Sequence, residues 1–152
     1  MKKILTLVLF ASTLLACNNV ETKNEEAAKP AETTKTYAEA GTLTLNNGAK
    51  WKSDESTTSN VKELQAIVNR FNENKNQTIE NYISVAKELQ TGLDKMIKEC
   101  RMEGADHDAL HLWLEPFLPN VNSLKKAIVK DDASKIFIEI DQHLNSYNQF
   151  FE

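Results

Sequence analysis

The sequence predicts an all-α protein, an up-down four-helix bundle preceded by a short β-hairpin and a disordered tether. Three observations carry this prediction. Apolar residues recur at spacings of three and four through the second half of the chain, which is typical of amphipathic helices. Four glycines and three prolines are too few for a turn-rich all-β fold. A length of 152 residues allows no more than one ordinary domain beside the leader and tether.

Residues 1–16 have the features of a signal peptide. Lys2 and Lys3 precede an apolar run that extends from Ile4 to Leu15. A run of this length is typical of a secretory h-region, whereas a bilayer-spanning helix needs about twenty apolar residues. No second long apolar run follows in the sequence. We therefore expect the leader to be removed and the chain to be exported.

The leader ends in Leu14-Leu15-Ala16-Cys17, which resembles the bacterial lipobox. The resemblance implies cleavage before Cys17 and acylation of that residue, which would anchor the chain in a membrane. The alternative is an ordinary secreted protein with a chance cysteine near its cleavage site. We expect a lipoprotein of the cell envelope, either on the periplasmic side or at the outer membrane.

Residues 17–40 are expected to form the lipidated cysteine and a disordered tether, and residues 41–152 the hairpin and bundle. Val20 and Tyr37 are the only sizeable apolar residues between 18 and 40, too few to offset the entropy of ordering this segment. Without Lys2 and Lys3 the chain keeps 16 basic and 22 acidic side chains. This acidic balance argues against a nucleic-acid partner.

A short hairpin is predicted where the folded part begins. Residues 43–45 and 49–51 alternate apolar and polar side chains around Asn46-Asn47-Gly48, and an Asn-Gly pair is a hairpin signal. Arms of about three residues are marginal unless they pack on another element. We expect Trp51 to provide that packing.

Four helices account for the remainder of the chain. Polar residues between Ser53 and Ser59 can cap the first helix, and Asp131 and Asp132 begin the fourth. The expected core positions are Val61, Leu64, Val68 and Phe71; Ile79, Tyr82, Ala86, Leu89, Leu93, Met96 and Cys100; Leu110, Leu114, Phe117, Val121, Leu124 and Ile128; and Ile136, Ile140, Leu144 and Tyr147. Short connections predict antiparallel neighbours.

Four residues mark expected boundaries and a distortion. Gly104 is expected to follow the C-terminus of the second helix, and Asp106 to cap the third. Pro116, like Pro119, lies inside the third run and removes an amide donor. We expect a kink or a break near Glu115.

The connection between the second and third helices holds an unusual set of side chains. Cys100 is the only cysteine besides Cys17, and Met102, His107 and His111 follow it closely. The helical periods place Cys100 and His107 at facing helix ends, with His111 one turn further and Met96 one turn below. Soft sulfur ligands with imidazole suit Cu(I), and Cys with His also suits Zn²⁺.

Several interpretations of this set remain open. The residues could form a metal site, with copper the preferred ion and Trp51 shielding it from water. They could equally be core and cap residues with no ligand, because buried Cys and Met are common core fillers. A b-type haem held by Met and His is a further alternative, and a redox-sensing thiol at Cys100 is another. His143 is expected to be a hydrogen-bonded histidine at the boundary of the core.

The segment from Cys100 to Leu114 resembles a motif in small, uncharacterised lipoproteins of Bacteroidetes. It has the form C-x-M-x-G-x-x-H-x-x-L-H-x-W-L, matched here by Cys100, Met102, Gly104, His107, Leu110, His111, Trp113 and Leu114. The same proteins tend to carry a segment like the one here at Leu43, Leu45, Asn46, Gly48, Lys50 and Trp51. The resemblance implies a lipoprotein with a helical domain and brings no established activity.

The sequence predicts no catalytic residues, since it contains neither a nucleophile elbow nor a Gly-rich phosphate loop. The leading functional hypothesis is a non-catalytic, lipid-anchored envelope protein that binds copper through Cys100, Met102, His107 and His111. The alternative is an interaction or scaffold lipoprotein whose helical surface meets another envelope protein. In both cases the membrane is a partner through Cys17.

Overall fold

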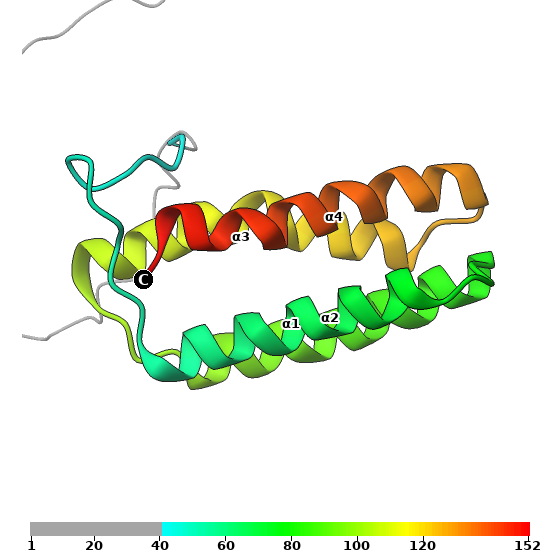
Figure 1. The fold of residues 1–152 in the computed structure, drawn as a ribbon, viewed down its shortest axis with the longest axis horizontal. Coiled ribbons are helices and arrows are strands. Elements are labelled where there is room, and N and C mark those ends of the chain that lie inside the picture. The colour runs from blue at the N-terminus through cyan, green and yellow to red at the C-terminus, as the bar shows by residue number, and fades with distance from the viewer. Residues whose placement is uncertain (1–40) are drawn as a thin grey trace, which may run out of the picture. The chain divides into compact units, whose positions relative to one another are not determined.

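Four helices joined by short connections form the bundle in the computed structural model, which describes residues 41–152 (Figure 1). The helices are α1 (Glu55–Glu73), α2 (Ile79–Glu99), α3 (Gly104–Lys125) and α4 (Lys130–Phe150). Consecutive helices run antiparallel, as predicted, and α1 and α2 both contact α4. The predictions for the leader, Cys17 and the tether lie outside the described residues.

Across residues 41–152, no helix combines the length and apolar character that crossing a membrane requires.

The core lies along the bundle axis and is built from the predicted seams. Fully buried side chains from all four helices contribute to it, including Leu64, Leu89, Phe117 and Leu144. Phe71, Tyr82 and Phe137 form an aromatic group within it, with ring centroids 4.5–5.8 Å apart. The heptad prediction for α2 is confirmed at Tyr82, Ala86, Leu89, Leu93 and Met96, while Ile79 and Cys100 are only partly buried.

The third apolar stripe ends earlier than predicted. Leu124 is fully buried, but Ile128 is 91% exposed, so its expected core position is wrong. The reason is that α3 ends at Lys125, and residues 126–129 form the connection to α4. The chain leaves the helical period before Ile128 can reach the core.

Capping groups define the starts of α1 and α2. The Asp54 carboxylate accepts a hydrogen bond from the Thr57 amide at 2.6 Å. Thr78 and Asn81 form a capping box at α2. At α3 the prediction is wrong: Gly104 (φ +63°) is the first helical residue rather than the residue ending α2.

Asp106 does not cap α3 either. Its Oδ1 accepts a hydrogen bond from the Lys52 amide at 2.9 Å, and Glu103, at the capping position, makes no side-chain cap. The carboxylate is therefore used to hold the segment that precedes α1 against the start of α3.

Both prolines lie inside an unbroken α3, so the predicted break does not occur. Phe117 and Val121, on either side of Pro119, are fully buried. Burial of this helical face on the rest of the bundle outweighs the loss of amide donors at Pro116 and Pro119.

The hairpin is present only as its turn. Asn46 and Ala49 exchange two backbone hydrogen bonds of 2.8 and 2.9 Å around Asn47 (φ 51°) and Gly48 (φ 89°), a geometry that suits Asn-Gly. The predicted arms do not pair beyond it. Instead, the backbone of Trp51 pairs with that of Phe151 in an isolated parallel β-bridge. The Trp51 indole donates a hydrogen bond to the Thr44 carbonyl at 2.7 Å. Trp51 therefore joins the turn to the C-terminal end of α4.

Candidate functional site

The structure brings four of the sulfur and imidazole side chains to one small cavity at the end of the bundle. The cavity has a volume of about 40 Å³ and lies between the end of α2 and the start of α3. It is lined by Met96, Ile97, Cys100, His107, Leu110, His111 and Leu114. The prediction that the α2–α3 connection gathers these residues is confirmed for Met96, Cys100, His107 and His111.

Helix ends set the positions of these side chains. Met96 is fully buried in the last turn of α2, and the Cys100 amide caps that turn by donating to the Met96 carbonyl at 2.9 Å. His107 and His111 lie one turn apart on α3, with their ring centroids 4.5 Å apart. Cys100 is a free, half-buried thiol, His107 is half-buried and His111 is exposed. The cavity therefore has one buried sulfur and three donors nearer to solvent.

Met102, predicted as a ligand, lies elsewhere. Its side chain is buried, and its sulfur accepts a weak hydrogen bond from the Ser53 hydroxyl with an O···S distance of 3.9 Å. It does not line the small cavity, because the connection between α2 and α3 turns this side chain toward the segment before α1. Trp51, expected to shield the site, does not line it either.

The donors are near one another without forming a closed cage. Among residues 41–152, no group of three or more His, Cys, Asp and Glu side chains is placed to hold a metal ion. Cys100, His107 and His111 therefore do not converge on one point as they lie. Met96, a thioether, is of a residue type outside that set, and it is the donor that lies deepest in the core.

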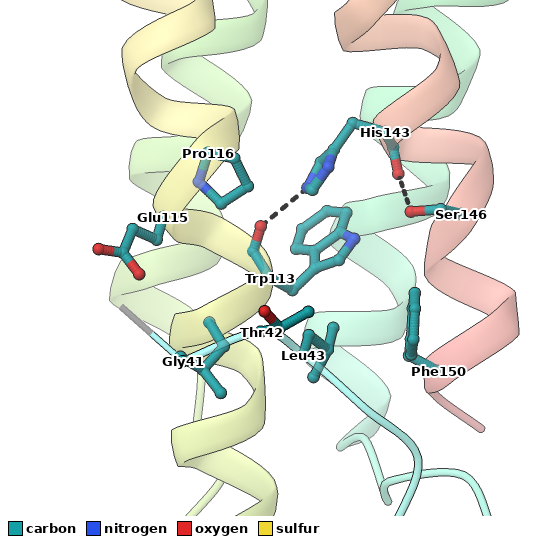
Figure 2. A pocket seen from close by; sticks show the side chains of 10 residues that line it. Gly41, Thr42, Leu43, Trp113, Glu115, Pro116, His143, Ser146 and Phe150 are labelled. Carbon is teal, nitrogen blue, oxygen red and sulfur yellow. Dashed lines mark hydrogen bonds between the residues drawn. The ribbon is translucent and has the colours of Figure 1, made fainter. Parts of the chain in front are cut away.

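A larger cavity, not predicted from the sequence, lies between α3 and α4 (Figure 2). Its volume is about 440 Å³, within the range of small-molecule pockets. It is lined by Gly41, Thr42, Leu43, Leu112, Trp113, Glu115, Pro116, His143, Ser146 and Phe150. The walls are mainly apolar. Because 30 residues separate Trp113 from His143, only the packing of α3 on α4 brings them together.

Trp113 and His143 form the polar centre of this wall. His143 Nε2 lies 2.8 Å from the Trp113 carbonyl oxygen, and since a carbonyl only accepts, Nε2 carries the hydrogen and donates. The two rings are stacked, with centroids 4.9 Å apart and an interplanar angle of 27°. Burial lowers the pKa of His143, and the bond to the Trp113 carbonyl opposes that shift only in part. His143 is thus a hydrogen-bonded boundary histidine, as predicted.

The indole nitrogen of Trp113 is a buried donor that finds no partner among the described residues. Trp113 is 1% exposed, and no acceptor within residues 41–152 forms a hydrogen bond with its Nε1. Figure 2 shows this nitrogen turned toward Ser146 and Phe150 on α4. Ser146 does not accept from it, and its own hydroxyl donates to the His143 carbonyl at 2.7 Å. An unpaired buried donor carries a desolvation penalty, of about 1–3 kcal/mol for groups of this kind.

Comparison with known proteins adds no assignment. No family model matches the chain, and no curated protein and no solved structure is significantly similar to it.

Proposed function

We propose that this chain is a lipid-anchored cell-envelope protein whose helical bundle binds Cu(I) and catalyses no reaction. One observation carries the metal part of the proposal: Met96, Cys100, His107 and His111 line a single small cavity. Thioether, thiolate and imidazole are ligands that suit Cu(I), an ion that accepts soft sulfur donors. Met102 is left out of the proposed ligand set because it contacts Ser53 instead.

The side chains have the freedom that binding requires. Cys100, His107 and His111 are only partly buried or exposed, so their rotamers can change without opening the core. Met96 is fixed by its burial and provides the inner ligand. Binding would then draw the end of α2 and the first two turns of α3 together, and the bundle itself would remain unchanged.

The lipid anchor is proposed from the first seventeen residues. The run from Ile4 to Leu15 followed by Ala16-Cys17 supports export, cleavage and acylation. Metabolic labelling with a fatty acid tests this part: the label should enter the wild-type protein and be absent from Cys17→Ser.

Cu(I) titration of reduced residues 18–152 against a competing chelator tests the metal site. We expect one ion per chain, with affinity lost in the double variant His107→Ala/His111→Ala and reduced in Met96→Leu. Met102→Leu is the matched control: it is the same substitution at a buried methionine outside the cavity, and its affinity should equal that of the wild type.

Absence of Cu(I) binding would contradict the metal proposal, and so would equal binding by the wild type and the double histidine variant. The cluster would then be core and cap packing. The alternative proposal, an interaction or scaffold lipoprotein that meets another envelope protein, would take its place.

A further inference from the structure

The connection between α3 and α4 ends in an exposed apolar pair. Ile128 is 91% exposed and Val129 is 49% exposed, and they are adjacent in the chain. Figure 1 places this connection at the same end of the bundle as the α1–α2 connection, and the C-terminus at the opposite end. We call Lys125, Lys126, Ile128, Val129 and Lys130 the basic tip.

Three lysines flank the apolar pair, and none of them forms an ion pair within residues 41–152. The acidic groups beside them are Asp131 and Asp132 in the first turn of α4, where the helix N-terminus favours negative charge. Asp132 also lies 3.9 Å from Lys135.

The tip is basic on a domain that is acidic. Residues 41–152 contain 13 basic and 17 acidic side chains, so the domain as a whole is negatively charged. Positive charge nevertheless prevails from Lys125 to Lys135, where four lysines face two aspartates. The α1–α2 connection at the same end adds Lys75, with Glu73 at the end of α1.

We propose that the basic tip docks on an anionic lipid surface. Ile128 and Val129 would enter the boundary between headgroups and acyl chains, and the three ammonium groups would meet lipid phosphates. A specific protein interface buries about 800 Å² on each partner, and two adjacent apolar side chains are far too few for its core. A lipid surface needs only a shallow apolar insertion together with positive charge.

This contact is compatible with the proposed anchor but does not depend on it. The α4 helix has 21 residues and is therefore about 30 Å long. The 23 residues between Cys17 and Gly41 can extend to about 75 Å, so an anchored domain has enough chain to bring its far end to the same membrane.

Co-sedimentation of residues 18–152 with lipid vesicles tests the proposal, since this chain retains the whole bundle and lacks Cys17. The chain should bind vesicles of phosphatidylglycerol and phosphatidylcholine in equal parts, and not vesicles of phosphatidylcholine alone. Binding should weaken in 0.5 M salt, which screens exposed charges. Changing Ile128→Ser and Val129→Ser together should abolish it, and each change of Lys125, Lys126 or Lys130 to Gln should weaken it about fivefold.

Two control variants separate the tip from a general surface effect. Ile138→Ser removes an isoleucine that is 51% exposed on the side of α4, and Lys62→Gln removes an exposed charge on α1. Both should bind anionic vesicles as the wild type does. Circular dichroism verifies that each variant is folded.

The proposal is overturned if the wild-type chain does not bind anionic vesicles, or if Ile138→Ser weakens binding as much as the double change Ile128→Ser/Val129→Ser. Because the experiment uses metal-free protein without an acyl chain, either result leaves the tests of Cys17 and of the copper site unaffected.

Discussion

The Asp54 carboxylate links the start of α1 to the α2–α3 connection, because its Oδ2 accepts a hydrogen bond from the Arg101 amide at 2.6 Å. Its Oδ1 caps α1 through the Thr57 amide and also accepts from the Ser56 hydroxyl at 3.0 Å. The same hydroxyl lies 2.9 Å from the Glu99 carbonyl oxygen, and its single hydrogen is donated to one of these two acceptors at a time. One carboxylate thus ties the start of α1 to the α2–α3 connection, at the end of the bundle that carries Cys100.

Replacing Asp54 should therefore cost more than the loss of an ordinary cap. We expect Asp54→Ala to lower the free energy of unfolding by about 2 kcal/mol, since the Thr57 and Arg101 amides both lose their acceptor. Asp54→Asn should cost less because it keeps one oxygen. Urea denaturation measures both. Asp94→Ala, on the exposed face of α2, is the control and should change stability by less than about 0.5 kcal/mol.

The same carboxylate gives the protein an acid-sensitive contact. Burial alone would raise the pKa of Asp54, but hydrogen bonds from Thr57, Arg101 and Ser56 outweigh it and lower the pKa. The unfolded chain therefore binds this proton more readily than the folded chain does. The stability that the Asp54 contacts contribute is present above the ordinary aspartate pKa and is lost as the pH falls through the lowered pKa. The loss with falling pH should be smaller in Asp54→Asn, and an equal loss in both proteins would contradict the assignment.

His143 should produce a second pH dependence at higher pH. Its lowered pKa means that the unfolded chain takes up the proton first as the pH falls. The contribution of neutral His143 to the free energy of unfolding should thus be complete above the ordinary histidine pKa, about 6.5. It should decrease as the pH falls below that value. Urea denaturation at pH 7.5 and 5.5 should show this decrease in the wild type and a smaller one in His143→Gln. A wild type equally stable at both pH values would contradict the prediction.

Gly92 is a position at which α2 packs tightly against Leu64 of α1. A Cβ placed there would lie 2.7 Å from Leu64 Cδ2, and Leu64 is fully buried. Alanine favours a helix by about 1 kcal/mol over glycine, but overpacking a core costs about 1–3 kcal/mol. We expect Gly92→Ala to destabilise the protein. Adding Leu64→Ala, which removes the overlapping methyl groups, should make the cost of Gly92→Ala disappear. Thermal denaturation of both backgrounds measures the difference.

Replacing the partly exposed Trp51 by Phe should cost more stability than replacing the buried Trp113 by Phe. In Trp113→Phe the loss of ring area is offset by removal of an unpaired buried donor, so stability should change by less than about 1 kcal/mol. Trp51→Phe removes a hydrogen bond to the Thr44 carbonyl and should cost about 1 kcal/mol or more. A larger loss of stability in Trp113→Phe than in Trp51→Phe would contradict this prediction.

Periodicity was sufficient to predict the helices and most of the core. Leu89, Leu93 and Met96 lie where a heptad requires them, because a helix packed on neighbours must bury one continuous stripe. The same rule failed at Ile128, since a hydrophobic spacing does not show where the backbone leaves the helix. A different rule, the preference of glycine for helix C-termini, failed at Gly104, whose positive φ begins a helix here rather than ending one.

The candidate site was predictable only in its local part. Two consecutive helices and their short connection carry all four residues of this cavity cluster, namely Met96, Cys100, His107 and His111. Local spacing is therefore enough to bring them to one cavity. The side chain of Met102 could not be placed in this way, because its orientation depends on a contact with the distant Ser53. The cavity at Trp113 and His143 depends on how α3 packs against α4, which spacing along one helix does not specify.

The parallel pairing of residues 51–53 with residues 150–152 has a consequence for biogenesis. The Ser53 amide donates to the Glu152 carbonyl at 2.9 Å, and the Tyr147 hydroxyl donates to the Ser53 hydroxyl at 2.6 Å. The partners of residues 51–53 are therefore synthesised only after α1, α2 and α3. The bundle closes only after synthesis has reached these residues, and a nascent chain that stops within α4 leaves the apolar faces of α1 and α2 open to chaperones and proteases.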